Sequence, residues 1–270
     1  MSIKTMSVLK WALLLAASLV LAFVMYALAQ WPTDVVPEGW IKCLVSVAVS
    51  GVMVTLYALF VKWIEREPAK DIPLQKLLSD TAKGFGVGAG FITTIVVVML
   101  ATGLCKITGV VTDQVTGIIT AFFYFVLVAV GEEILFRGVM FRWIDEKWGF
   151  VTALVTSAIL FGAMHMGQPN ATWWSSLAIA IEAGLMLGAA YKWSGTLWFP
   201  IGIHWAWNFF QGNIFGFAVS GSDAGVSLLH SVTNGPEILT GGSFGAEASI
   251  ITVILGAILS AWFIFKARVR

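Results

Sequence analysis

The feature that most constrains this chain is a series of long apolar runs. A helix that crosses a lipid bilayer needs about 20 consecutive, mostly apolar residues. Eight segments approach that length, at roughly residues 8–29, 40–63, 84–104, 114–140, 150–166, 172–191, 197–217 and 247–266. They lack the alternation of polar and apolar residues that is typical of a transmembrane barrel strand. The sequence therefore predicts an all-α membrane protein, a polytopic bundle of about eight transmembrane helices.

The composition indicates that lipid is part of the solvent. Hydrophobic residues make up 59% of the 270 residues and charged residues only 11%, whereas soluble domains average about 45–50% apolar and about 25% charged residues. A globule of this size cannot hide that excess of apolar side chains in its interior. The net charge of +1 gives no indication of nucleic-acid binding.

The distribution of basic residues predicts how the helices are oriented. When the N-terminus is placed in the cytoplasm and all eight runs cross, Lys42 and Lys106 fall on the outer side, and the other 14 of the 16 basic residues fall on the inner side or at inner helix ends. Those residues are Lys4, Lys10, Lys62, Arg66, Lys70, Lys76, Lys83, Arg137, Arg142, Lys147, Lys192, Lys266, Arg268 and Arg270. Because cytoplasmic loops carry an excess of Lys and Arg, we expect a multi-pass protein of the plasma (inner) membrane with both termini in the cytoplasm.

The segments outside and between the runs predict further features. The mixed-charge stretch 62–83 is typical of a cytoplasmic linker or a surface helix. Residues 212–246 are rich in Gly and Ser and lack Lys and Arg, which is typical of an outer loop. We expect residues 1–29 to be a retained anchor, because their apolar run is longer than that of a usual signal peptide. Cys43 and Cys105 fall near the outer ends of consecutive runs. Either a disulfide or two unpaired buried thiols fits these positions.

Ionisable residues interrupt the apolar runs of the second half. A charged side chain at the bilayer centre costs about 2.5–3.5 kcal/mol on insertion scales, so it needs a partner or a water-filled cavity. Glu133 and Arg137 are four residues apart, share a helix face and can pair. Glu132 lies on a different face and stays available for chemistry. The alternative is a purely structural ion pair that holds two helices together.

Two further polar pairs follow at helical spacing. Phe161 and His165 share a face of the fifth run, and His204 and Asn208 share a face of the seventh. Each pair also has a structural explanation, since a histidine near a helix end is commonly an interfacial residue. An interhelical hydrogen bond in a membrane is worth about 0.6 kcal/mol. Glu182, in the sixth run, is a supporting carboxylate or a partner for Arg137 or a histidine.

The combination of these patterns resembles the CPBP family of membrane proteases. That family includes the type II CAAX prenyl endopeptidases (Rce1-like, Abi) and bacterial relatives in bacteriocin processing and self-immunity, and its signature is EExxxR, FxxxH and HxxxN. The matching residues here are Glu132-Glu133…Arg137, Phe161…His165 and His204…Asn208. The resemblance covers roughly residues 121–217. It implies a catalytic membrane core at 111–270, to which residues 1–110 add N-terminal transmembrane helices and the linker, all in one integrated domain.

The resemblance also implies roles for these residues. Glu132 and His165 would activate a water molecule, and His204 and Asn208 would stabilise the oxyanion that forms. The supporting residues would be Glu133, Arg137, Phe161 and Glu182. The residue types suit this chemistry, because a positioned carboxylate or histidine can act as a general base and positioned donors stabilise an oxyanion.

The resemblance leaves the use of a metal open. Glu132, His165 and His204 match a catalytic zinc ligand set, and the family has been classed both as metalloproteases and as glutamate-type enzymes. The helical HExxH arrangement is absent. We favour water activation that requires no cofactor, with Zn²⁺ as the alternative bound by those three residues.

The predicted depths of these residues do not match in straight helices. At a rise of about 1.5 Å per residue, Glu132 lies about 16 Å from a cytoplasmic end near Trp143 and His165 about 22 Å from Phe150, but His204 is only about 10 Å deep. Gly149, Gly162, Pro200 and Gly202 are candidate positions for adjusting the helices. We expect the site to open to the cytoplasm, because Arg137, Arg142 and Lys147 lie toward that end of the fourth run.

The predicted function is that of an intramembrane endopeptidase that hydrolyses a peptide bond in a membrane-associated peptide or protein. Its partners would be a membrane-anchored peptide or protein substrate and the lipid bilayer, with no nucleic acid. The alternatives are a non-catalytic scaffold or immunity protein and a transporter that uses the same polar cluster. No inverted repeat that would favour a transporter is apparent in the sequence.

Overall fold

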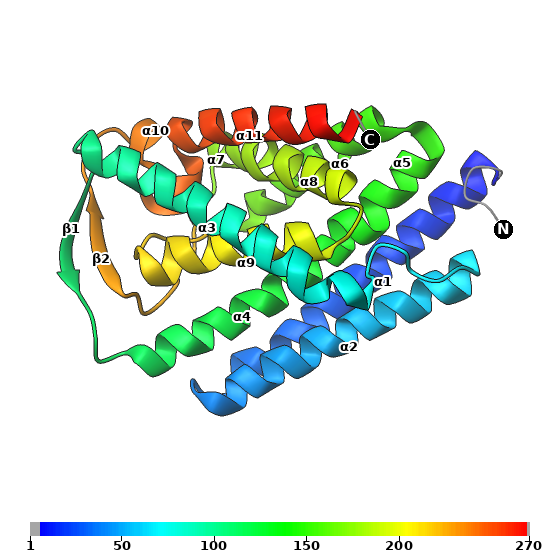
Figure 1. Ribbon diagram of the computed structural model, residues 1–270, viewed down its shortest axis with the longest axis horizontal. Coiled ribbons are helices and arrows are strands. Elements are labelled where there is room, and N and C mark those ends of the chain that lie inside the picture. Colours follow the sequence, from blue (N-terminus) through cyan, green and yellow to red (C-terminus); the bar gives the residue numbers. More distant parts are fainter. Residues whose placement is uncertain (1–5, 269–270) are drawn as a thin grey trace.

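The helices of this chain run back and forth between two ends of the molecule, as the computed structural model shows (Figure 1). The structure describes the backbone of residues 6–268, and the side chains of that range except those of residues 21, 25, 26, 28–34 and 65. The first five residues of the predicted anchor lie outside the described residues. So do Lys4 and Arg270, which were counted in predicting the orientation.

Helix makes up most of the described chain. In chain order the longer helices are α1 (Val8–Val35), α2 (Trp40–Glu65), α3 (Leu77–Ala101), α4 (Val115–Glu133), α5 (Arg142–Trp148), α6 (Phe150–Met164), α7 (Trp173–Ile179), α8 (Met186–Ser194), α9 (Trp198–Phe209) and α11 (Ile250–Arg268). Three π-helical segments continue or join them: η3 (Ile134–Phe141), η5 (Ala180–Leu185) and η6 (Phe210–Ile214). The short turns are η2 (Leu74–Lys76), η4 (His165–Gly167), α10 (Glu237–Thr240), η7 (Gly242–Phe244) and η8 (Ala246–Ala248).

The all-α polytopic membrane fold is confirmed. Six of the described helices are long and apolar enough to cross a membrane: Trp40–Ile64, Leu74–Ala101, Val115–Trp148, Phe150–Gly167, Trp173–Ser194 and Ile250–Arg268. They correspond to six of the eight predicted runs. The other two predicted runs also form helices, namely α1, of which Val8–Val24 is apolar, and α9 with η6. Length and hydropathy alone therefore support six spans rather than eight.

Helix α9 is the central element of the bundle. Every residue of α9 except Trp205 is buried. Glycines let α3 approach it closely, since a Cβ on Gly84 would lie 2.0 Å from the Phe199 carbonyl oxygen and one on Gly88 would lie 2.3 Å from that of Ile203. Small residues of this kind permit close helix packing in membranes. The contact fixes the part of α9 that carries His204.

The predicted depths of Glu132 and His204 did not match because two of the predicted helix ends are wrong. The helix of the fourth run continues through η3 and α5 to Trp148, so Glu132 lies about 24 Å from that end at a rise of about 1.5 Å per residue. Helix α9 begins below the surface, where the Leu197 N–H donates to the Asp71 carbonyl at 2.7 Å and the Trp198 indole to the Pro73 carbonyl at 3.0 Å. His204 is therefore deeper than its position in α9 implies.

The two ends of the bundle differ in structure and in charge. One end, here called the hairpin end, carries the antiparallel strands β1 (Cys105–Val110) and β2 (Leu229–Thr233), which the sequence did not predict. The other, here called the basic end, carries α5, the start of α1 and the end of α11 (Figure 1). Cys43 and Cys105 are buried free thiols, so the disulfide alternative is not realised.

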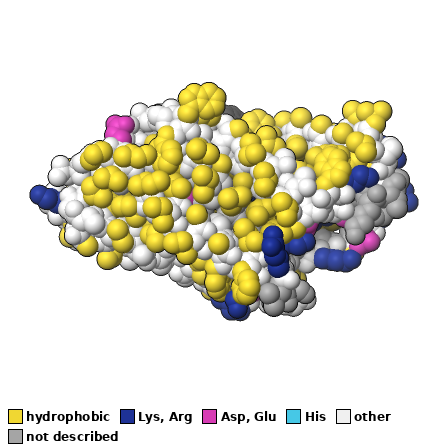
Figure 2. Space-filling model, turned by 90° about the horizontal axis from the view of Figure 1, so that it is seen from above, with side chains coloured by type: hydrophobic (Ala, Val, Ile, Leu, Met, Phe, Trp, Pro, Cys, Tyr) yellow, Lys and Arg dark blue, Asp and Glu magenta, His cyan; other side chains and the backbone are white. Residues whose placement is uncertain are grey.

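The surface between the two ends is apolar. On the face shown in Figure 2, hydrophobic side chains cover the middle of the molecule and most of the visible Lys and Arg side chains lie toward one end. Exposed residues on α11 include Ile254, Ile258, Trp262 and Phe265. A soluble monomer rarely exposes so large an apolar surface, and this distribution suits a lipid-facing surface.

Candidate active site

The first polar element of the site is a buried ion pair at the end of α4. Arg137 lies in η3, and its Nη1 donates to Glu133 Oε1 at 2.9 Å, with both side chains fully buried. Its Nη2 lies 3.4 Å from the Ala183 carbonyl oxygen and 3.3 Å from that of Gly184. Arg137 thus neutralises the carboxylate and joins the fourth run to η5 through backbone acceptors.

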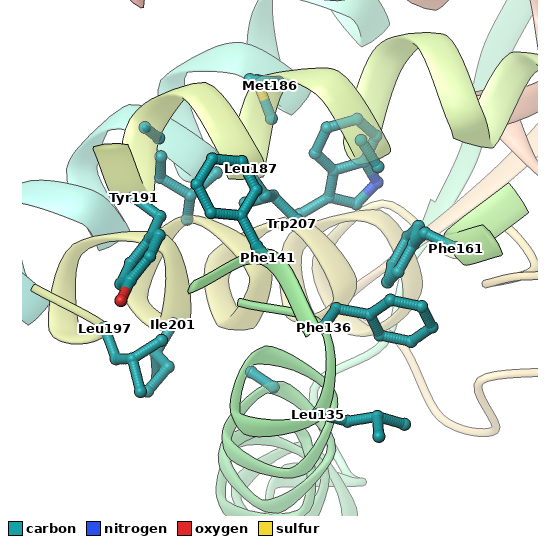
Figure 3. Packing of buried hydrophobic residues seen from close by; sticks show 14 of the residues in the cluster. Leu135, Phe136, Phe141, Phe161, Met186, Leu187, Tyr191, Leu197, Ile201 and Trp207 are labelled. Carbon is teal, nitrogen blue, oxygen red and sulfur yellow. The ribbon is translucent and has the colours of Figure 1, made fainter. Parts of the chain in front are cut away.

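The Phe161 ring lies among the charged groups. The Arg137 guanidinium carbon lies 4.7 Å from the ring centroid, within cation–π range. Phe136 packs edge-on against the same ring with centroids 4.8 Å apart, and Figure 3 shows the two rings together. The Phe161 centroid also lies 4.7 Å from that of His165 and 6.2 Å from that of His204. The phenylalanine of the FxxxH pattern therefore holds three polar side chains at fixed distances.

His204 lies between two carboxylates. Its Nδ1 is 2.9 Å from Glu133 Oε1 and its Nε2 is 3.9 Å from Glu132 Oε2. Because Glu133 is paired with Arg137 and so accepts hydrogen bonds as a carboxylate, Nδ1 of His204 is the donor in this contact. The Nε2 atom is then directed toward Glu132. Two carboxylate partners suit the doubly protonated form of the imidazole.

His165 is held in one tautomer by the backbone. It follows the last residue of α6 and begins the turn η4, and its Nδ1 lies 2.7 Å from the Phe161 carbonyl oxygen. A carbonyl oxygen only accepts hydrogen bonds, so Nδ1 carries the proton. In the neutral imidazole Nε2 then has a free lone pair, which can accept a proton or a hydrogen bond.

The four predicted catalytic side chains meet in one pocket. Glu132, His165, His204 and Asn208 all line a pocket of about 500 Å³. His165, His204 and Asn208 are nearly buried, and the Glu132 side chain is 14% exposed. Three of the predicted supporting residues, Glu133, Arg137 and Phe161, lie directly behind them. The structure thus places the motif residues around a single space, while their catalytic roles stay predictions.

The pocket opens at the hairpin end of the bundle. Its outer lining consists of Glu38, Lys42, Gly117 and residues 222–226. The prediction of an opening toward Arg137, Arg142 and Lys147 is therefore wrong. Arg137 lies in the closed interior, where Glu133 neutralises its charge. It is therefore at the buried end of the site and not at its entrance.

Two further carboxylates lie beside the motif residues. Glu182 was named from the sequence, but Glu247 was not. Glu182 is fully buried, and neither of its carboxyl oxygens has a hydrogen-bond partner among the described residues. The alternative that it pairs with Arg137 or a histidine is therefore wrong. Glu247 in η8 accepts a hydrogen bond from the Ser220 backbone N–H. Burial raises the pKa of Glu247 to about 7, although hydrogen bonds from Ser220, Gln211 and Trp207 act to lower it.

These two carboxylates border a small cavity next to the main pocket. The cavity has a volume of about 20 Å³ and is also lined by His165, His204 and Asn208. That volume accommodates about one water molecule. Glu247 was not singled out from the sequence, because it is the first residue of the last apolar run and a charge there is ordinarily a helix-end residue. Its position directly after a glycine-rich loop was the feature that could have indicated a role in the site.

The donor set does not form a metal site in this arrangement. Among the described residues, no group of three or more His, Cys, Asp and Glu side chains is placed so that it could hold a metal ion. Of the three residues of the zinc alternative, His204 has its Nδ1 bound to Glu133 and its Nε2 3.9 Å from Glu132. Zn²⁺ bound by Glu132, His165 and His204 stays the alternative to water activation without a metal.

Comparison with known protein families gives a match to the central part of the chain. Residues 114–210 match the family model described as type II CAAX prenyl endopeptidase Rce1-like. No curated protein and no solved structure matches the chain. The matched residues run from the start of α4 to the end of α9 and include all three motifs, so the match supports membership of the CPBP/Rce1-like family.

Proposed function

From the premise that residues 114–210 are an Rce1-like membrane-protease domain, we propose that this chain is an intramembrane endopeptidase that cuts a membrane-anchored peptide or protein. Glu132 and His165 activate the attacking water, and His204 and Asn208 bind the oxyanion. No metal is required in this proposal. The protein resides in the plasma (inner) membrane with both termini in the cytoplasm.

The first step is the attack of water on the peptide carbonyl. Glu132 faces the pocket and takes a proton from the water as the oxygen attacks the carbonyl carbon. The unprotonated Nε2 of His165 accepts the second hydrogen of the same water and so orients it. A positioned general base contributes about 10²–10⁴-fold to a rate of this kind.

The second step is stabilisation of the tetrahedral intermediate. The carbonyl oxygen becomes an oxyanion, which Nε2–H of doubly protonated His204 and the Asn208 side-chain amide contact as donors. Glu133 and Arg137 keep His204 in this orientation through the contact of 2.9 Å at Nδ1. Removal of one donor of this type costs about 10²–10³-fold in turnover.

The last step breaks the C–N bond. The intermediate collapses, the carbon–nitrogen bond breaks, and Glu132 gives the proton it took from water to the leaving amine. The carboxylic acid that forms then gives its proton to the amine, so the products are a carboxylate and an ammonium group, and Glu132 has returned to its ionised form. The observation that carries the proposal is that Glu132, His165, His204 and Asn208 line one pocket in the apolar bundle.

Comparative mapping of protein N-termini in membranes tests the proposal. Membranes that carry the wild type are compared with membranes that carry Glu132→Gln or His165→Ala. We expect precursor polypeptides to accumulate in both variants and their new N-termini to appear only with the wild type. The third histidine supplies a matched control, because His230 is exposed on β2 and contacts Thr108. His230→Asn should behave as the wild type.

Two outcomes would contradict the proposal. If Glu132→Gln and His165→Ala complement a deletion fully and leave every N-terminus unchanged, the polar cluster has a structural or scaffold role. If Glu132 is required for flux of a solute across proteoliposomes and no peptide bond is cut, the chain is a transporter.

A further inference from the structure

The mouth of the pocket lies at one defined end of the bundle. The lining residues nearest the surface are Glu38 and Lys42 around the start of α2, Gly117 near the start of α4, and the loop residues 222–226. These segments lie at the hairpin end, where β1 and β2 also lie (Figure 1). The polar site is therefore reached from the hairpin end.

The opposite end of the bundle carries nearly all of the basic residues. Lys42 and Lys106 belong to the hairpin end. The described basic residues at the basic end are Lys10, Lys62, Arg66, Lys70, Lys76, Lys83, Arg142, Lys147, Lys192, Lys266 and Arg268. Because Lys and Arg are retained on the cytoplasmic side of a membrane, the basic end is cytoplasmic and the hairpin end is not.

The route from the mouth to the site follows one face of α4. The lining residues Gly117, Thr120, Tyr124, Val128 and Glu132 are spaced by three or four positions, which places them on a single face. From Gly117 to Glu132 the helix rises about 22 Å. An extended polypeptide advances about 3.3 Å per residue, so about seven residues would fill this route.

The inner end of the route is closed by buried groups. Glu133 and Arg137 are fully buried, and Phe161 is 2% exposed. They lie between the catalytic residues and the basic end. A cytoplasmic C-terminus would approach the basic end, where the pocket has no lining residue.

We propose that the site acts on the non-cytoplasmic side of the membrane, and that its substrate is a translocated, membrane-anchored polypeptide. The polypeptide enters at the hairpin end as an extended segment of about seven residues, follows α4, and presents a peptide bond to Glu132. This inference rests on the proposed endopeptidase function and names its substrate class. It excludes a lipidated cytoplasmic C-terminus as the substrate.

Labelling of single cysteines in spheroplasts of a bacterial host tests the orientation. Cys43 and Cys105 are both buried and are replaced by alanine. Asp223→Cys then reports on the mouth and Lys70→Cys on the basic end, since both native side chains are exposed. We expect a membrane-impermeant maleimide to label Asp223→Cys in intact spheroplasts and Lys70→Cys only after permeabilisation. Labelling in detergent confirms that both thiols react.

The reverse labelling pattern would overturn the proposal, and so would labelling of neither or both positions in intact spheroplasts. The labelling does not depend on proteolysis, so it still reports the orientation if the proposed function fails. The cleavage sites of the precursors that accumulate with Glu132→Gln supply the second test. We expect them on the non-cytoplasmic side of each precursor, and cleavage sites in cytoplasmic segments would refute the substrate class while leaving the endopeptidase function intact.

Discussion

The buried ion pair between Glu133 and Arg137 allows a quantitative prediction. Arg137→Met removes a guanidinium that lies 2.9 Å from Glu133 and 4.7 Å from the Phe161 centroid. The Glu133 carboxylate is then left with His204 as its remaining partner in a fully buried position. Breaking a buried pair in this way costs about 3–5 kcal/mol of stability. We expect the free energy of unfolding to fall by that amount.

A double variant separates the loss of the charge pair from the loss of packing. In Glu133→Gln/Arg137→Met no unpaired charge remains, and the amide oxygen of the introduced glutamine can still accept from His204 Nδ1. Replacement of a buried ion pair by uncharged groups is often close to neutral. We therefore expect the double variant to be at least about 2 kcal/mol more stable than Arg137→Met.

Unfolding by SDS in mixed micelles, followed by tryptophan fluorescence, measures these differences, because the chain has 13 tryptophans. Lys192→Met is the matched control. Lys192 pairs with Asp145 at 2.5 Å, but its side chain is 38% exposed, and pairs of this kind contribute about 0–1 kcal/mol. A cost below about 1 kcal/mol for Arg137→Met, or a double variant whose loss equals the sum of both single losses, would refute the reasoning.

Three further predictions concern packing, pH and metal dependence. Gly88→Ala should lower stability by about 1–3 kcal/mol and reduce activity, because its Cβ would lie 2.3 Å from the Ile203 carbonyl oxygen. Gly90→Ala, which meets no atom within 4 Å, should change neither, and equal thermal unfolding of the two variants would contradict the close α3–α9 contact. Glu247 has a pKa raised by burial from 4.5 to about 7, so its stabilising contribution is present below pH 4.5 and lost as the pH rises through 7. Between pH 4.5 and 7 the free energy of unfolding of the wild type should therefore fall by up to about 3 kcal/mol because of this group. Glu247→Gln, unfolded at a series of pH values, should lack this fall. Equal pH profiles of the two proteins would show that the pKa of Glu247 is not raised. Dialysis against a strong chelator should leave proteolysis largely intact, whereas complete loss that Zn²⁺ restores would establish a metal enzyme.

The helices could be predicted well from the sequence because the bilayer fixes their length and polarity. Each apolar run forms a helix, and the i, i+4 spacing of Glu133 with Arg137 and of His204 with Asn208 places each pair on one face. The cost of a charge in lipid requires those residues to find partners or a cavity. These two constraints are sufficient to group the motif residues from the sequence alone.

Other features depend on tertiary contacts that leave no local signal. Asp145, Glu146 and Lys147 are typical of a loop, but they continue the helix to Trp148. The burial of the start of α9 depends on the contact between Leu197 and Asp71, which are far apart in the chain.

The pairing of β1 with β2 and the contact of Glu247 with Ser220 likewise join segments that local patterns do not connect. The predicted direction of the pocket is wrong because a basic residue does not always mark an entrance. In the structure Arg137 is neutralised internally by Glu133, and an arginine count cannot distinguish this case from a surface charge.

The most direct test of the account is the rate at which purified protein in proteoliposomes cuts a precursor identified from the N-terminal mapping. The measurement is kcat/KM for the wild type and for Glu132→Gln, with SDS unfolding confirming that both are equally folded. We predict that kcat/KM falls by about 10²–10⁴-fold in the variant, which is the contribution of a general base. A variant that cuts the precursor within about twofold of the wild-type rate would contradict the assignment of Glu132 as that base.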